Sequence, residues 1–186
     1  MDHPAAAMTP ARRGYWLSMA ALAVILPATL AVSGWGAFVN WRAVNVREPT
    51  TAQVGQKVDY AGAQWTVTRL TRLAGGEGRA VVLAEFEAVI PDPEALANVP
   101  CQIGLSDGEG RTWQPVFLGD PVVRAMYPEA MQRALCGGPS FAEARGGEPV
   151  KMAASFAIPA SASDLKLSVA LLSALPAYLS VSEPQP

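Results

Sequence analysis

"RAVVLAEFEAVI", residues 79–90, alternates between two faces with a period of two. The residues on one face are all apolar: Ala80, Val82, Ala84, Phe86, Ala88 and Ile90. The other face is apolar at its ends and carries Glu85 and Glu87 in the middle. This pattern is typical of a β-strand that buries one face in a core, and we expect the two glutamates to lie on a solvated face.

Shorter strand patterns flank this stretch on both sides. VGQKVDY (54–60) and QWTVTRL (64–70) are separated by the turn-prone AGA, which predicts a hairpin. CQIGLSD (101–107) and RTWQPVF (111–117) are separated by a glycine-containing turn and predict a second hairpin. Three more strands are expected at VKMAASFAI, LKLSVALLS and AYLSV.

These short strands, with no helix between successive ones, predict an all-β domain over residues 52–182. The expected fold is an antiparallel immunoglobulin-like β-sandwich, and a small closed barrel is the alternative. Residues 118–149 are expected to be irregular apart from one short helix over PEAMQRAL (128–135), because Pro128 suits a first helical position. The link PDPEALANVP (91–100) is expected to be too polar for burial.

The front of the chain has a different character. No charged residue occurs from Tyr15 to Val39, and a helix of this length suffices for a bilayer core, which needs about 20 apolar residues. Aromatic residues near both ends suit the headgroup level. The sequence therefore predicts four parts besides the domain: a cytoplasmic tail (1–14), a transmembrane signal-anchor helix (15–39), a linker (40–51) and a disordered tail (183–186).

Two other interpretations of the apolar segment are considered. Arg12 and Arg13, the apolar core 16–30 and the small residues Ala31 and Ser33 also match a cleaved secretion signal. A buried helix of a soluble protein is disfavoured, because the predicted strands leave no helical layer to cover it. Basic residues are equally frequent near both ends of the segment. The extracytoplasmic orientation of the domain therefore depends on the short leading tail, the signal-like character and the paired cysteines.

Cys101 and Cys136 are the two cysteines of the chain. Outside the membrane an even pair is expected to form a disulfide. Free buried thiols, a reactive dithiol and a copper site with Met126 and Met131 are the alternatives, and soft-metal ligands at close repeated spacing are missing. A disulfide would stabilise the fold by about 3–4 kcal/mol in the loop-entropy treatment and would fix the irregular segment to the second hairpin.

The sequence lacks the residues that most enzymes use. The single histidine, His3, lies in the predicted tail, so we expect no histidine-based triad or zinc site in the domain. No aromatic sugar platform accompanies Glu85 and Glu87. DGEG (107–110) offers two acids where calcium takes six or more oxygens, so we expect a turn. We expect no catalytic activity, no cofactor and no metal, and Trp113 is expected to pack in the hairpin or core.

Nucleic-acid binding is not expected either. The formal net charge of the chain is −2, and its arginines are spread singly among acids, whereas a nucleic-acid binder shows clustered basic residues. A solvated, mixed surface explains this distribution.

Several phrases together resemble a family of bacterial extracytoplasmic proteins, in which an immunoglobulin-like domain of unknown function follows one membrane helix or a lipid anchor. In this chain the matching phrases are Val54-Gly55, Trp65, Ala80 to Ile90, Leu105 to Trp113, Phe156 to Pro159, and Leu165 to Leu167. The Leu105 to Trp113 phrase has the form L-x-D-x-x-G-R-x-W. The resemblance covers residues 52–182 and implies an interaction or accessory role outside the membrane, without catalytic residues.

We therefore expect a single-pass protein of the bacterial inner membrane, whose extracytoplasmic domain binds another membrane or extracytoplasmic protein. A secreted inhibitor or small-ligand carrier is the alternative, and an enzyme that uses Glu85 or Asp107 is a third hypothesis. The partner surface is expected between Leu118 and Cys136, with contacts at Val122, Met126 and Tyr127. Loops that contain proline and methionine and are held by a disulfide present ordered apolar area.

Overall fold

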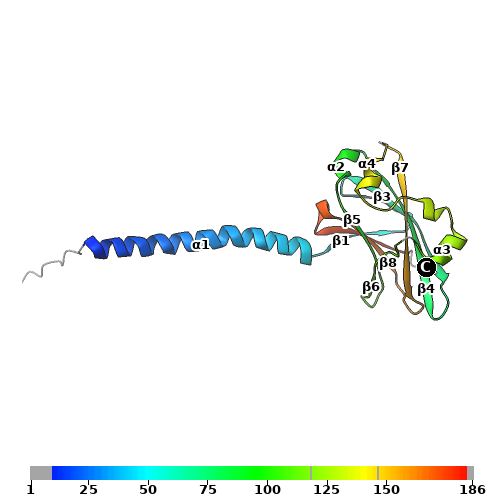
Figure 1. Ribbon diagram of the computed structural model, residues 1–186, viewed down its shortest axis with the longest axis horizontal. Helices are drawn as coiled ribbons and strands as arrows, with labels where there is room; N and C mark the ends of the chain where they lie inside the picture. Colours follow the sequence, from blue (N-terminus) through cyan, green and yellow to red (C-terminus); the bar gives the residue numbers. More distant parts are fainter. Residues whose placement is uncertain (1–9, 118, 146, 184–186) are drawn as a thin grey trace, which may run out of the picture. The chain divides into compact units, whose positions relative to one another are not determined.

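The computed structural model describes residues 10–117, 119–145 and 147–183. The chain divides between Val46 and Arg47 into two compact units, an N-terminal helix and a β domain. Each unit is described by itself (Figure 1).

The N-terminal unit is the helix α1, Pro10–Asn45. Its stretch Gly14–Arg42 is long and apolar enough to cross a membrane, and its position near the N-terminus suits a membrane anchor and a signal sequence alike. Pro27 lies inside the helix without ending it. The hydroxyl of Thr29, two residues later, donates to the carbonyls of Ile25 and Leu26 at 2.9 Å.

The helix is longer than the sequence predicted at both ends. It begins inside the predicted tail 1–14 and continues through Asn45, and the first strand then starts at Glu48. The predicted linker 40–51 is therefore occupied by regular structure, apart from Val46 and Arg47. No proline or glycine interrupts residues 40–45, so nothing in the sequence stops the helix there. Residues 1–9 and 184–186, where tails were predicted, lie outside the described residues.

The β domain consists of two sheets, as predicted, and not of a closed barrel (Figure 1). Sheet A has the order β1-β9-β8-β5-β6, and sheet B has the order β2-β3-β4-β7. The strands are β1 (Glu48–Gln53), β2 (Lys57–Tyr60), β3 (Ala63–Ala74), β4 (Arg79–Val89), β5 (Cys101–Ser106), β6 (Thr112–Trp113), β7 (Pro149–Pro159), β8 (Lys166–Leu171) and β9 (Ala177–Ser182). The two predicted hairpins are confirmed as β2–β3 and β5–β6.

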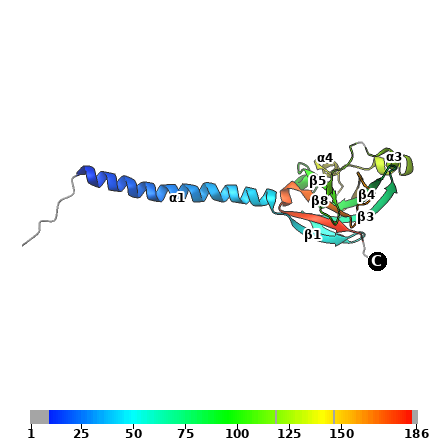
Figure 2. The same cartoon turned by 90° about the horizontal axis from the view of Figure 1, so that it is seen from below.

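The expectation of a wholly antiparallel fold is wrong at one edge. β1 pairs in parallel with β9, from Glu48 opposite Ala177 to Gln53 opposite Ser182, and the two strands lie side by side in Figure 2. A parallel pair between the first and last strands depends on tertiary structure, because no local turn connects them. Gly55, at a φ of 85°, then redirects the chain from sheet A to sheet B.

The core lies between the sheets. All six apolar residues predicted for the inner face of the 79–90 stretch are buried, and Trp65, Phe141 and Phe156 are among the largest side chains that join them. Tyr60 links the sheets at one end, because its hydroxyl donates to Ala177 of β9 and accepts the N–H of Leu171 of β8, both at 3.0 Å. These buried partners satisfy a polar group that would otherwise be costly inside the core.

Short helices fill the connections, and the sequence analysis missed most of them. They are α2 (Pro93–Leu96), α3 (Pro121–Met126), the 3₁₀ helix η1 (Ala130–Gln132), α4 (Gly138–Ala142) and the 3₁₀ helix η2 (Leu172–Ala174). The helix predicted over 128–135 is only the single turn η1. It ends because Ala134 forms a parallel bridge with Met152 of β7, so tertiary pairing overrides helix propensity.

Two of these helices begin at an Asp-Pro pair. Asp92 accepts the N–H of Ala95 at 3.3 Å, and Asp120 accepts the N–H of Val122 at 2.9 Å. An aspartate N-cap followed by proline at the first position is a recognised helix start. The 91–100 link also buries Leu96, contrary to the expectation that it is too polar for burial.

Candidate functional site

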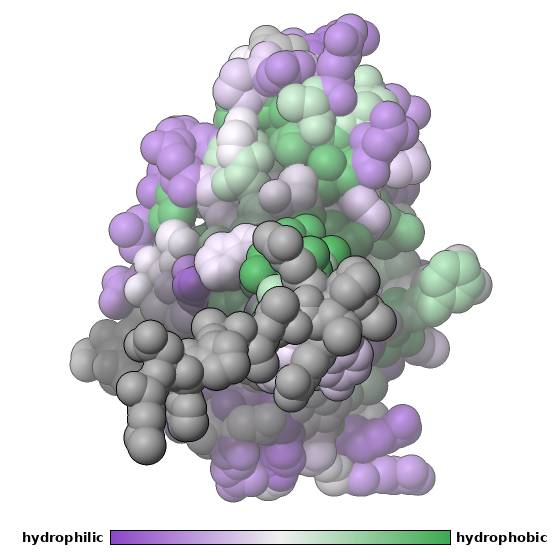
Figure 3. Space-filling view, turned by 90° about the vertical axis from the view of Figure 1, so that its left-hand side faces the viewer, coloured by the Kyte–Doolittle hydropathy of each residue, from purple (hydrophilic) through white to green (hydrophobic). Residues whose placement is uncertain are grey.

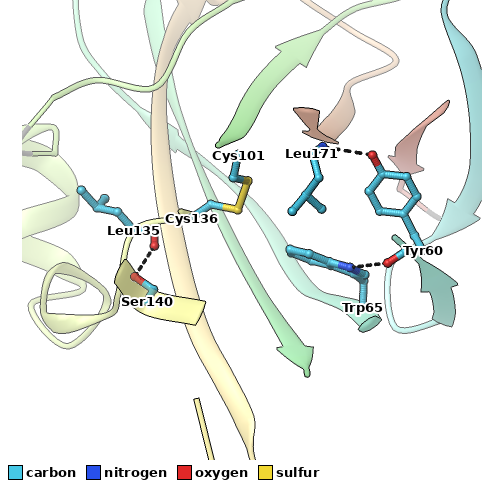
Figure 4. Close-up of a disulfide and its surroundings, with 7 residues drawn as sticks. All are labelled: Tyr60, Trp65, Cys101, Leu135, Cys136, Ser140 and Leu171. Atoms are coloured by element: carbon cyan, nitrogen blue, oxygen red, sulfur yellow. Dashed lines mark hydrogen bonds between the residues drawn. A yellow bond between two sulfur atoms is a disulfide. The ribbon is translucent and has the colours of Figure 1, made fainter. Parts of the chain in front are cut away.

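Cys101 and Cys136 are joined by a disulfide, the pairing that the sequence predicts. Cys101 is the first residue of β5, and Cys136 follows η1 (Figure 4). Both cysteines are half-buried and pack against the core. The bond therefore fixes the last residue of the segment 114–136, which we call the covering segment, to the first residue of β5. Leu118, within this segment, lies outside the described residues.

The covering segment packs on the outer face of sheet B. Val123 and Ala130 are buried there and form a second hydrophobic cluster with apolar side chains of β3, β4 and β7. The members of the cluster from the strands are Leu73, Val81, Leu83 and Ala153. Sheet B is therefore covered on both faces around Leu83, which the alternating pattern of β4 does not reveal.

This packing changes the environment of Glu85. The residue is 4% exposed, so the expectation of a solvated position is wrong. Its Oε1 lies 2.8 Å from Nη2 of Arg133 in the covering segment, and its Oε2 lies 3.3 Å from Nε of Arg69 in β3. Both carboxylate oxygens are engaged by guanidinium groups. Glu85 thus joins the covering segment to sheet B, while Glu87 on the same face is half-buried.

Asp107 is also buried and lies in the β5–β6 turn. Its Oδ1 accepts the backbone N–H groups of Glu109 and Arg111 at 3.1 and 2.9 Å, and its Oδ2 accepts Nε of Arg111 at 2.7 Å. Burial acts to raise the pKa of Asp107, but the hydrogen bonds and positive charge of Arg111 outweigh it and hold the pKa below its ordinary value. The acid therefore closes the turn.

Trp113 lies in the same hairpin. It is half-buried and packs against the main core, as the sequence predicted. The guanidinium carbon of Arg111 lies 5.7 Å from the ring centroid of Trp113, a distance typical of cation–π contact. Arg111 thus stabilises the β5–β6 hairpin through its contacts with both Asp107 and Trp113.

The three predicted partner contacts have different environments. Val122 and Tyr127 are half-buried and pack against the second cluster, so they hold the covering segment in place. Met126 is 59% exposed. Of the three, only Met126 offers a mostly free apolar side chain.

Two further exposed apolar residues of the covering segment were missed by the sequence analysis. Phe117 is 82% exposed and Leu135 is 70% exposed. Leu135 points away from the disulfide and from Trp65 in Figure 4, and its carbonyl accepts the hydroxyl of Ser140 at 2.6 Å. The sequence gives one indication that Leu135 has a fixed position, because Leu135 directly precedes Cys136 of the disulfide.

A depression of about 1340 Å³ runs across sheet A, with lining residues from β1, β9, β8 and β5, and extends to the covering segment. Its lining includes Ile103, Gly104, Val116, Phe117, Met131 and Leu135. On the face of the molecule shown in Figure 3, hydrophilic residues lie around much of the outline, and hydrophobic residues lie in separate patches between them. Within the residues that the structure describes, no group of three His, Cys, Asp or Glu side chains is placed to hold a metal ion.

No family model and no curated protein matches this chain. Among solved structures, the chain is similar to the yjhA protein from Bacillus subtilis, with 16% identity, a TM-score of 0.49, and coverage of 71% of this chain and 99% of that one. A conserved hypothetical protein from Bacillus anthracis has 12% identity and a TM-score of 0.41, covering 65% and 89% of the two chains. An uncharacterized β-sandwich protein from Clostridium difficile 630 has 7% identity and a TM-score of 0.42, covering 73% and 95%.

Proposed function

We propose that this chain is a membrane-anchored extracytoplasmic module that binds another protein without catalysing a reaction. The supporting observation concerns the exposed large hydrophobic side chains of the described β domain, which are Phe117, Met126, Leu135 and Leu172. The first three lie on the covering segment. Exposed apolar side chains that gather on one ordered segment are typical of a protein-interaction surface.

The covering segment is held firmly enough to present these side chains in fixed positions. The disulfide and the Glu85–Arg133 ion pair fix one end. Val123 and Ala130 anchor the middle in the second cluster, and the N–H of Val116 donates to the carbonyl of Ser155 of β7 at 2.7 Å at the other end. A surface that is already ordered loses less conformational entropy on binding than a flexible loop does.

The arrangement of charged groups gives no support to catalysis. Glu85 and Asp107 are the two acids that the enzyme hypothesis would use, and both are buried against arginines that occupy their oxygens. A general acid or base must reach a substrate proton with a free lone pair or proton of its own.

The immunoglobulin-like class is part of the proposal. Adjacent strands β3-β4-β7 match the A-B-E order of one immunoglobulin sheet, and β5-β8-β9 match the C-F-G order of the other. The additional strands β1, β2 and β6 lie at sheet edges, where additions leave the central order intact.

The location at the bacterial inner membrane is supported by two features. α1 has the length and composition of a membrane span, and the disulfide favours an oxidising compartment outside the cytoplasm. A secreted, soluble form remains the alternative, because the same helix passes as a signal sequence.

Co-purification after crosslinking in membranes tests the function. A Phe117→Ser, Leu135→Ser double variant is expected to lose the partner that the wild-type full-length chain retains. Leu172→Ser is the matched control, because Leu172 is also exposed but lies on η2, outside the covering segment. Equal recovery of the partner by the double variant and the wild type would refute the proposal.

A further inference from the structure

We propose that the partner presents an extended polypeptide segment, which adds to sheet A as a strand along the open edge of β5 at Ile103. This inference rests on the proposed function and specifies the form of the partner. Addition of a strand to a sheet edge supplies affinity through main-chain hydrogen bonds and specificity through alternate side chains.

The edge is open because β8 pairs with the whole length of β5, whereas β6 pairs with only part of it. β8 pairs with all six residues of β5, from Cys101 to Ser106. On the other side, β6 pairs only with Leu105 and Ser106. The remaining part of β5 therefore borders the depression without a paired strand in the described part of the chain.

The direction of the main-chain groups follows from the ladder. The N–H of Leu172 donates to the carbonyl of Pro100 at 3.1 Å, so Pro100 faces β8. Hydrogen-bonding direction alternates along an antiparallel strand, so Gln102 and Gly104 also face β8. Ile103 then directs its N–H and C=O toward the open side, as Leu105 does where it meets Trp113.

Pro115 explains why β6 stops short of Ile103. The register that places Trp113 opposite Leu105 would place Pro115 opposite Ile103, and proline has no N–H to donate to a ladder. The chain instead crosses to sheet B, where the N–H of Val116 donates to Ser155. The β5–β6 ladder therefore ends at Leu105, two residues short of Ile103.

The neighbouring edge of sheet B is protected in a way that the β5 edge is not. β7 bonds Val116 through Ser155, and it forms the bridge with Ala134 through Met152. Natural proteins commonly cover or block sheet edges, because unpaired main-chain groups attract other strands. At Cys101 the disulfide partner Cys136 is close, with 5.6 Å between the Cα atoms, so the open stretch is centred on Ile103.

The lining of the depression is mixed, with charged residues such as Arg47 and Lys166, and its apolar residues suit the side chains of such a strand. Phe117 and Leu135 are exposed and apolar, and they line the same depression as Ile103. Main-chain donors and acceptors flanked by apolar side chains match a polypeptide strand with alternating apolar residues. A small polar ligand would gain nothing from contact with Phe117 and Leu135. A helical peptide would have no free main-chain groups to form hydrogen bonds with Ile103.

Peptide binding to the full-length chain in lipid nanodiscs tests this inference. Displayed octapeptides are selected on the nanodiscs, and the best binder is synthesised with single N-methyl groups at each residue in turn. Methylation at the one residue whose N–H bonds the carbonyl of Ile103 is expected to weaken binding about tenfold or more, because it removes that main-chain donor, while methylation at its immediate neighbours has little effect. A uniform effect at all positions, or none at any, would overturn the proposal.

Two variants sharpen the test. Ile103→Pro removes the N–H that faces the open side and leaves the β8 ladder intact, so it is expected to weaken peptide binding about tenfold or more. Ile103→Val keeps the N–H and is expected to bind as the wild type does. If the Ile103→Pro variant does not fold, the scan of N-methylated peptides against the wild-type chain still tests whether the peptide binds through a main-chain hydrogen bond.

The remaining outcomes separate this inference from the proposed function. If no octapeptide is selected, the strand proposal is overturned, while recovery of a partner that depends on Phe117 and Leu135 still supports the binding module. A different result is that the wild-type chain forms a concentration-dependent dimer in nanodiscs that the Ile103→Pro variant does not form. This result would show that the edge binds a second copy of this chain, and it would overturn the proposal of a separate partner.

Discussion

Asp107 is a buried carboxylate that holds the turn of the β5–β6 hairpin. Its folded pKa is held below the ordinary value, with the bonds and charge of Arg111 outweighing the opposite effect of burial. A depressed folded pKa contributes stability above the unfolded pKa of about 3.9, and this contribution is lost as the pH falls through the folded value. We therefore expect Asp107→Asn to lower the melting temperature at pH 7 and to differ less from the wild type in acid.

Thermal unfolding of both proteins between pH 7 and pH 2 measures this difference. Glu109→Gln is the control, because Glu109 contacts the same Arg111 at 3.2 Å but its side chain is 71% exposed. We expect its effect to be small at every pH, as for most surface ion pairs. A constant gap between the Asp107→Asn and wild-type melting temperatures across the pH range would show that the carboxylate charge does not stabilise the turn.

Glu85 carries a second prediction at the residue scale. Glu85→Gln removes the charge that Arg133 and Arg69 share and leaves both arginines near an apolar cluster. Loss of one partner of a fully buried pair costs about 3–5 kcal/mol. We expect about 1–3 kcal/mol here, because Arg69 is half exposed and can be hydrated. Urea unfolding measures this loss, and Glu87→Gln on the same strand face is the matched control.

At the scale of elements, α4 packs closely on the chain that follows α2. A Cβ added at Gly138 would overlap with the carbonyl oxygen of Ala97, and a backbone atom cannot move away as a flexible side chain can. We expect Gly138→Ala to destabilise the domain by about 1–3 kcal/mol, the usual cost of overpacking. Gly137→Ala is the control, because its Cβ would meet only Cδ of Pro139 at 3.9 Å and its backbone is extended.

Chemical denaturation of the two glycine variants distinguishes these cases. Equal denaturation midpoints for Gly138→Ala and Gly137→Ala would mean that α4 can move away from Ala97 without a loss of stability. Such a result would also weaken the case for a fixed covering segment, because Cys136 lies directly before these glycines.

The elements that the sequence predicts well are those with local signals. The alternation of residues 79–90 predicts β4, and glycine-containing turns predict the β5–β6 hairpin, because period-two patterns and turn residues act on neighbouring positions. The covering segment has no such period. Its burial depends on Val123 and Ala130 meeting β4, and the buried state of Glu85 depends on Arg133, more than 40 residues away in the sequence.

The candidate site shows the same limit. The cysteine pair was predicted from composition and compartment. The exposure of single side chains in the covering segment was not, since Val122 and Tyr127 pack inward whereas Phe117 and Leu135 are exposed. Hydrophobicity alone does not separate an apolar residue that anchors a segment from one that the segment presents.

At the scale of the whole molecule, the anchor and the disulfide make one joint prediction. A retained α1 would place the β domain at a membrane, and a Cys101–Cys136 pair found oxidised in the isolated protein would place that domain outside the cytoplasm. We expect the intact mass of the protein, isolated from its own membranes without reductant, to be that of the full chain less two hydrogens. Reduction and alkylation should then add two blocking groups, which counts the thiols independently.

Each other mass contradicts a different part of this account. A chain that begins near Gly34, after the small residues at Ala31 and Ser33, would show cleavage of the signal and make the protein soluble. A full-length chain with both thiols free would place the domain in a reducing compartment, where the covering segment loses one of its attachments. Because Leu135 lies directly before Cys136, a reduced pair would free Leu135, whereas the β5 edge and Phe117 would still be held by the β8 ladder and by the bond from Val116 to Ser155.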